Sequence, residues 1–189
     1  MLRRTFALAG GAALLSLATA RTALAEGEPT MPKSPRDIVA TRIFNVPVAD
    51  VWQAWADPEL VKRWWGPIGF TCPLAKMDLR VGGTSLVAMR GPDGTDMYST
   101  WAYTRLTEHA YFEYIFNLSD AAGNKLDPVA LGFPPDFPRD ARHDVVFKPL
   151  EGGRTEMVMT EYGYTNDQLF DLSKAGLEQC LDKMVAIFA

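Results

Sequence analysis

The chain has 189 residues, and 19 lysines and arginines against 23 aspartates and glutamates give a formal net charge of −4 at pH 7. Because the chain is acidic and its basic residues do not cluster, we expect no nucleic-acid partner and no attachment to an anionic membrane surface. Its two cysteines, Cys72 and Cys180, lie far apart and match no metal-binding spacing. In an oxidising compartment they could pair, but we expect two free thiols, and we expect no metal and no cofactor.

The first 25 residues have the features of an export signal. Arg3 and Arg4 give a basic start, residues 6–20 are apolar and rich in small side chains, and residues 23–25 (Ala-Leu-Ala) fit the pattern that signal peptidase cleaves. The apolar run is too short to be a lasting membrane anchor, so we expect no stable membrane insertion. The adjacent arginines also fit a twin-arginine signal. The alternative is a buried N-terminal helix.

These features divide the chain into three parts. We predict a cleaved signal peptide over residues 1–25, a flexible polar linker over residues 26–35 and one folded domain over residues 36–189. The mature protein is then expected to be periplasmic or secreted.

The folded part begins with a predicted strand and two short helices. Residues 36–45 form a predicted strand, in which Ile38, Ala40, Arg42 and Phe44 alternate with Asp37, Val39, Thr41 and Ile43. Residues 48–55 carry apolar side chains at helical spacing. Asp57 can cap a second helix, with Pro58 at its first position. Residues 64–67 (Trp-Trp-Gly-Pro) end that helix and turn the chain.

The middle of the chain is rich in strand-forming residues. Turn signals occur at residues 81–84 and 91–94, and residues 97–106 and 111–118 form the clearest predicted strand pair. In its second strand, we expect Phe112, Tyr114 and Phe116 to share the inner face. The phase of the first strand, which contains Trp101 and Tyr103, stays open.

A segment rich in proline and glycine, residues 119–142, separates this pair from a last predicted hairpin, residues 144–150 and 155–162. Its prolines exclude a regular helix or an interior strand. A loop of this length in a compact domain is usually functional or mobile. We therefore expect a lid here, with Phe133 and Phe137 closing over a cavity.

The chain ends in a long predicted amphipathic helix. Thr165 and Gln168 have the spacing of a capping box at its start. One apolar stripe runs along it, comprising Leu169, Leu172, Gly176, Leu177, Cys180, Leu181, Met184 and Phe188. To bury this stripe, the helix must lie across the concave face of a curved antiparallel sheet, which predicts an α+β fold. Such a fold leaves a cavity unless large side chains fill it.

Six segments that together span nearly all of the folded part are residues 42–47, 51–58, 64–67, 78–83, 90–94 and 175–184. These segments resemble the START-like (SRPBCC, helix-grip) superfamily, in the branch related to the activator of heat-shock protein 90 ATPase. The resemblance implies the helix-grip fold. The superfamily includes lipid carriers, hormone receptors, polyketide cyclases and dehydratases, and chaperone co-regulators, and the fold alone does not choose among them. The export signal departs from the branch and disfavours a cytosolic activator.

Three groups of residues carry candidate chemistry. The tryptophans of the helix pair could grip a ligand or anchor the helices to the core, and we expect mainly the second, with Trp65 the best candidate for a cavity wall. His109 and His143 are expected to be surface turn residues without a nucleophile beside them. Glu161 is either a solvated acid or, if it faces the cavity, a group with a raised pKa able to act as a general acid or base.

The sequence therefore predicts an exported protein that binds a small apolar or amphipathic molecule inside the domain. A cyclase, dehydratase or hydrolase using a pocket acid or tyrosine, and a protein-interaction module, are the alternatives. No catalytic residue is assigned. The predicted ligand-binding residues are Trp65, Phe70, Trp101, Tyr103, Phe112, Tyr114, Phe116, Phe137, Glu161, Leu177 and Leu181.

Overall fold

The computed structural model of the chain describes residues 36–189. The predicted signal peptide and linker lie outside the described residues, so they stay predictions. The elements in chain order are β1 (Arg36–Phe44), α1 (Val48–Ala56), α2 (Pro58–Trp64), β2 (Thr71–Lys76), β3 (Thr84–Arg90), β4 (Asp96–Thr107), β5 (Tyr111–Ser119), the 3₁₀ turn η1 (Pro128–Leu131), β6 (Ala141–Leu150), β7 (Arg154–Tyr164) and α3 (Asp167–Ala186).

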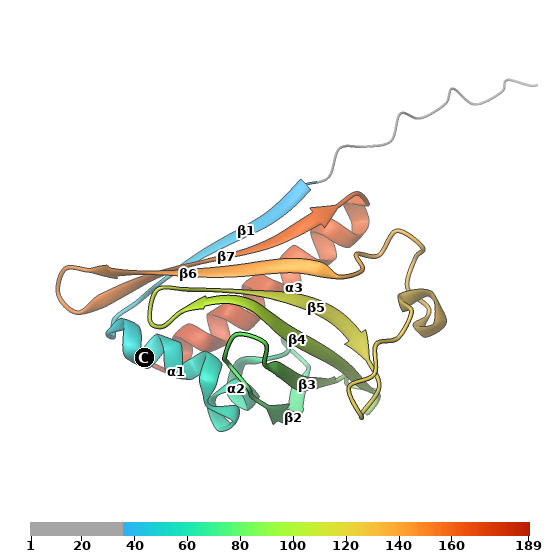
Figure 1. Cartoon of the computed structure of the whole chain (residues 1–189), viewed down its shortest axis with the longest axis horizontal. Coiled ribbons are helices and arrows are strands. Elements are labelled where there is room, and N and C mark those ends of the chain that lie inside the picture. Colours follow the sequence, from blue (N-terminus) through green and yellow to red (C-terminus); the bar gives the residue numbers. More distant parts are fainter. Residues whose placement is uncertain (1–35) are drawn as a thin grey trace, which may run out of the picture. The chain divides into compact units, whose positions relative to one another are not determined.

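The seven strands form one antiparallel sheet in the order β1-β7-β6-β5-β4-β3-β2 (Figure 1). Strands β2 to β6 each pair with the next strand in the chain, whereas β1 pairs with the last strand, β7. The long helix α3 runs across this sheet, and α1 and α2 lie near one end of it (Figure 1). The predicted α+β helix-grip fold is confirmed.

Side-chain alternation along the strands determines which face packs against α3. Phe112 and Tyr114 of β5 are buried, as predicted for the inner face. The sequence left open which residues of β4 face inward. In the structure Trp101 and Tyr103 are both buried, so they lie on the inner face. The pairing of β4 with β5 shifts register between Tyr103 and Arg105, a local irregularity that the sequence pattern does not reveal.

The helix pair is an aromatic anchor for the core. Asp57 caps α2 as predicted, because its side chain accepts a hydrogen bond from the Glu59 amide. Trp55 and Trp64 are fully buried with ring centroids 4.7 Å apart. The Trp64 indole N–H donates to the Ala54 carbonyl at 2.7 Å, which fixes α2 against α1. The expectation that tryptophans here mainly anchor helices fits this packing.

Helix α3 differs from the prediction in two respects. Its N-cap is Asn166, whose side chain accepts from the Leu169 amide, so the predicted Thr165–Gln168 capping box is wrong. The buried members of the apolar stripe lie in the C-terminal half and are Leu177, Cys180, Leu181 and Met184, whereas Leu172 in the N-terminal half is 63% exposed. The N-terminal half of the stripe therefore faces something other than packed core.

Polar contacts hold the C-terminal half of α3 in place. Arg42 of β1 forms ion pairs with Glu178 and Asp182. The Lys183 Nζ donates to the Gly66 carbonyl at 2.7 Å, which ties the helix to the turn that follows α2. Cys72 and Cys180 are both buried and free, as expected. Within residues 36–189, no helix is long and apolar enough to cross a membrane.

Candidate functional site

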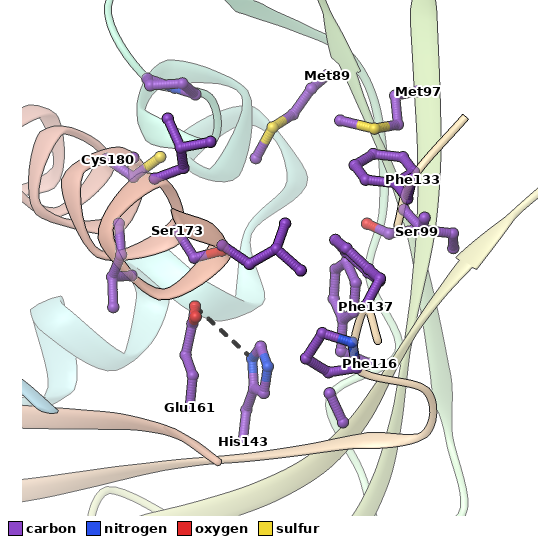
Figure 2. A pocket seen from close by; sticks show the side chains of 18 of the residues that line it. Met89, Met97, Ser99, Phe116, Phe133, Phe137, His143, Glu161, Ser173 and Cys180 are labelled. Carbon is purple, nitrogen blue, oxygen red and sulfur yellow. Dashed lines mark ion pairs between the residues drawn. The ribbon is translucent and has the colours of Figure 1, made fainter. Parts of the chain in front are cut away.

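A cavity of about 400 Å³ lies between the N-terminal half of α3, the inner face of the sheet and the segment that joins β5 to β6 (Figure 2). Every strand from β3 to β7 contributes to its wall. The lining residues are Trp65, Pro67, Phe70, Met89, Met97, Ser99, Phe116, Leu118, Phe133, Phe137, Pro138, Ala141, His143, Glu161, Tyr164, Leu169, Leu172, Ser173, Gly176, Leu177 and Cys180.

The apolar wall is built from side chains that pack incompletely against one another. Met89 of β3 and Met97 of β4 face each other across the β3–β4 pairing and are both half-buried. Phe133 and Phe137, in the segment predicted to be a lid, are also half-buried, with ring centroids 4.5 Å apart. Both phenylalanines line the cavity, so the segment forms part of its wall, as the sequence led us to expect.

Six of the predicted ligand-binding residues line this cavity. Trp65 and Phe70 come from the turn after α2, and Phe116, Phe137, Glu161 and Leu177 complete the group. Trp65 is 6% exposed, and its ring contacts those of Trp64 and Trp101. One side of Trp65 therefore packs against the core, and the other side lines the cavity.

The other five predicted residues do not line the cavity. Trp101, Phe112 and Leu181 are fully buried in the core beneath α1, α2 and the C-terminal half of α3. Tyr103 is also in the core, where its hydroxyl lies 3.0 Å from that of Ser85, and Tyr114 is fully buried. Alternation identifies the inner face of a strand, but it does not say where along the strand the core ends and the cavity begins.

Glu161, Tyr164 and His143 of the cavity wall form a polar cluster with Tyr114, which lies behind the wall. Ser99 and Ser173 add two hydroxyl groups elsewhere in the wall. The Tyr164 hydroxyl donates to Glu161 Oε2 at 2.7 Å, and His143 Nδ1 lies 3.0 Å from the Tyr114 hydroxyl. Glu161 Oε1 is 4.0 Å from His143 Nδ1. Figure 2 shows Glu161 and His143 rising side by side among the lining residues. Glu161 therefore faces the cavity, as one of the two expectations had it.

The prediction that His143 is a surface turn residue is wrong. His143 lies in β6 and is 5% exposed, with its ring stacked on Phe116 at 5.4 Å between centroids. Ala141 and Val145, two positions before and after His143, lie on the inner face of β6. Alternation along the strand therefore indicates that His143 also points inward, although histidine is not a typical core residue. His109 does lie in a turn, with φ of 58°.

Burial shifts the pKa values of this cluster in opposite directions. Desolvation raises the pKa of Glu161 to about 7, although the hydrogen bond from Tyr164 acts the other way. Desolvation lowers the pKa of His143 to about 3, because the imidazolium cannot be hydrated there. The histidine is thus neutral at pH 7, and the 4.0 Å contact is not an ion pair under those conditions even though its length would suit one.

Glu113 is a second buried carboxylate, but its pKa is lowered rather than raised. It lies on the outer face of β5, away from the cavity, and it accepts hydrogen bonds from Arg105 and Thr104. These bonds, that to Arg105 foremost, lower the pKa of Glu113 to about 2. A charged partner therefore distinguishes Glu113 from Glu161, whose surroundings contain none. In the part of the chain from residue 36 onward, no cluster of His, Cys, Asp or Glu is arranged to hold a metal ion.

A curved antiparallel sheet that grips a long C-terminal helix defines the START-like, helix-grip class. The family model described as Activator of Hsp90 ATPase homolog 1-like protein matches residues 45–189. The chain belongs to this family, and the resemblance in its sequence is confirmed.

Solved structures share the fold at low sequence identity. Protein Ms6760 from Mycobacterium smegmatis is 24% identical with a TM-score of 0.62, over 79% of this chain and 86% of that one. A protein from Arthrobacter aurescens is 24% identical with a TM-score of 0.67, over 80% and 85%. The AHSA1 protein from Silicibacter pomeroyi is 16% identical with a TM-score of 0.63, over 80% and 96%. No curated protein matches the chain.

Proposed function

We propose that this chain is an exported protein that binds a small, largely apolar molecule in the cavity beneath α3. The observation that carries the proposal is the cavity itself, whose volume of about 400 Å³ suits a small ligand. Its wall combines aromatic, methionine and leucine side chains with one polar cluster, the composition typical of small-molecule sites.

The family description names an ATPase activator, a role that is exercised on a partner protein. The leader predicted over residues 1–25 would remove this chain from a cytosolic ATPase. The proposal therefore rests on the interior of the domain rather than on a protein-binding surface.

A second candidate function, that of a cyclase, dehydratase or hydrolase, is favoured by Glu161. A carboxyl group with a pKa of about 7 in an apolar cavity can both accept and donate a proton at neutral pH. In such an enzyme, Glu161→Gln would keep ligand affinity and lose turnover by about 100-fold or more. A binding protein has no turnover to lose.

The test is to fill the cavity from α3. Gly176 lines the cavity, and a Cβ added to it meets no atom within 4 Å. We expect Gly176→Phe to occupy the space that a ligand needs, without removing any side chain from the core. Ala175→Phe is the matched control, because Ala175 is the exposed neighbour on the same helix.

The measurement is fluorescence titration with the uncharged apolar probe N-phenyl-1-naphthylamine. We expect saturable binding to the wild type, affinity weaker by about tenfold or more in Gly176→Phe and little change in Ala175→Phe. No binding to the wild type, or equal affinity in both variants, would overturn the proposal.

A further inference from the structure

We propose that Glu161 anchors a protonated amine on the cavity ligand, so that the cavity selects amphipathic amines over acids and alcohols of the same chain length. This inference rests on the proposed binding function and names the class of ligand.

The hydrogen-bond pattern around Glu161 leaves one carboxylate oxygen free. Oε2 accepts from the Tyr164 hydroxyl, whereas Oε1 accepts no hydrogen bond from any residue between 36 and 189. The nearest candidate donor, His143 Nδ1, is 4.0 Å away, beyond hydrogen-bond distance, and it is already paired with the Tyr114 hydroxyl. Glu161 is 7% exposed and lines the cavity, so a group on a cavity ligand can reach and satisfy Oε1.

The charges around the cavity point to a cation. Among the lining residues described above, Glu161 is the single acid and there is no lysine or arginine. The nearby Lys183 is bound to the Gly66 carbonyl. A buried carboxylate without a cation is costly, and a charge-assisted hydrogen bond from an ammonium group offsets that cost. A ligand carboxylate would instead face a like charge with no cation to neutralise either group.

The rest of the cavity suits the apolar tail of such a ligand. The wall opposite Glu161 in Figure 2 carries Met89, Met97 and Phe133, which are apolar and half-buried. Methionine side chains adapt to chains of differing shape. The amine group would therefore lie at Glu161 and the tail would extend toward the methionines.

The experiment compares three ligands that differ only in the head group. At pH 8, decylamine, decanol and decanoic acid are each titrated against N-phenyl-1-naphthylamine bound to the protein. The proteins compared are the wild type, Glu161→Gln and Glu156→Gln, and the measurement is the concentration of each ligand that displaces the probe. Glu156 lies on the same strand but on its outer face, so Glu156→Gln makes the same charge change away from the cavity.

We expect decylamine to displace the probe from the wild type at a concentration about tenfold lower than decanol, with decanoic acid weakest. Glu161→Gln should remove this order while leaving probe affinity within about twofold, and Glu156→Gln should preserve it. If the probe binds but the three ligands compete equally, or if the preference survives in Glu161→Gln, the amine inference fails and the proposed function stands. If the probe does not bind the wild type, the proposed function itself fails.

The pH dependence provides a second readout. The groups facing Glu161 are His143 on β6, Tyr114 on β5, Tyr164 on β7 and Cys180 on α3, and burial keeps each of them neutral between pH 5.5 and 8. An alkylamine also stays protonated in that range. Binding to a protonated Glu161 must expel its proton, so decylamine affinity should weaken by up to about tenfold per pH unit below pH 7, whereas decanol affinity should not change. A flat profile for decylamine would contradict the inference.

Discussion

Glu161 and His143 lie side by side and respond to the same burial in opposite ways. Burial penalises the charged form of each group, so the pKa of the acid rises and that of the base falls. Both are largely neutral in the folded protein between about pH 4 and pH 6, a range that lies above the pKa of His143 and below that of Glu161. The neutral pair is compatible with an apolar cavity, and it leaves the acid able to ionise when a cation approaches.

These shifts predict how stability varies with pH. The raised pKa of Glu161, from 4.5 to about 7, contributes stability that is present below pH 4.5 and is lost as the pH rises to 7. The lowered pKa of His143, from 6.5 to about 3, contributes stability that is present above pH 6.5 and is lost as the pH falls toward 3. Between pH 4.5 and 6.5 the two slopes oppose each other.

Glu161→Gln should expose the contribution of His143. We expect the free energy of unfolding of this variant to rise between pH 4.5 and 6.5, by at most about 1.4 kcal/mol per pH unit, relative to the wild-type curve. Urea titrations at a series of pH values measure it. Glu156→Gln, on the outer face, should follow the wild type. If the curves for Glu161→Gln and the wild type run parallel, the pKa of Glu161 is not raised in the folded protein.

At the scale of the element, α3 has two halves with different surroundings. Its C-terminal half packs into the core through Leu181 and Met184, both fully buried. Its N-terminal half covers the cavity, where Leu172 is 63% exposed although its side chain lines the wall. Leu177 lies at the boundary between the halves, 5% exposed and in contact with the cavity.

Truncation of these leucines should therefore give a graded series. We expect Leu181→Ala to cost about 2–5 kcal/mol, the range for leucines in packed cores. Leu177→Ala should cost less, because the space beside it is already open, and Leu172→Ala should change stability by about 0.5 kcal/mol or less. Chemical denaturation followed by tryptophan emission measures all three. Equal costs at Leu181 and Leu172 would rule out the division of the helix into core and cavity halves.

The segment between β5 and β6 is the second element that shapes the site. Phe133 and Phe137 pack on each other, and its base is held by the Lys125–Asp140 ion pair at 2.6 Å. The prolines here exclude a long helix or an interior strand but allow the short 3₁₀ turn η1, so the chain passes over the cavity instead of continuing the sheet.

At the scale of the whole molecule, the leader predicts where the protein works. We expect the mature chain to begin at Glu26 and to lie outside the cytoplasm. N-terminal sequencing of protein from fractionated cells measures this. An intact Met1 on cytoplasmic protein would refute the prediction and restore the activator role. Replacement of Arg3 and Arg4 with lysine separates the routes, because a twin-arginine signal should lose export whereas a general signal should keep it.

The sequence determined the elements, because local patterns encode them. Alternation predicted β1 and the inner face of β5, Asp57 and Pro58 predicted the start of α2, and the apolar stripe predicted α3. The family followed from the same segments. The cap of α3 was misplaced by one residue, since Thr165 and Asn166 are both capable caps and backbone geometry selects between them.

Only the tertiary structure decided where the core ends and the cavity begins. Tyr114 and Phe116 alternate on the same face of β5, yet one is fully buried and the other lines the cavity. Likewise, alternation can place Glu161 and His143 on the inner faces of their strands, but it does not show that a cavity lies there. Their burial arises because β6 and β7 bring them together beneath α3, and the cost of desolvating a charge is set by that enclosure rather than by neighbours in the chain.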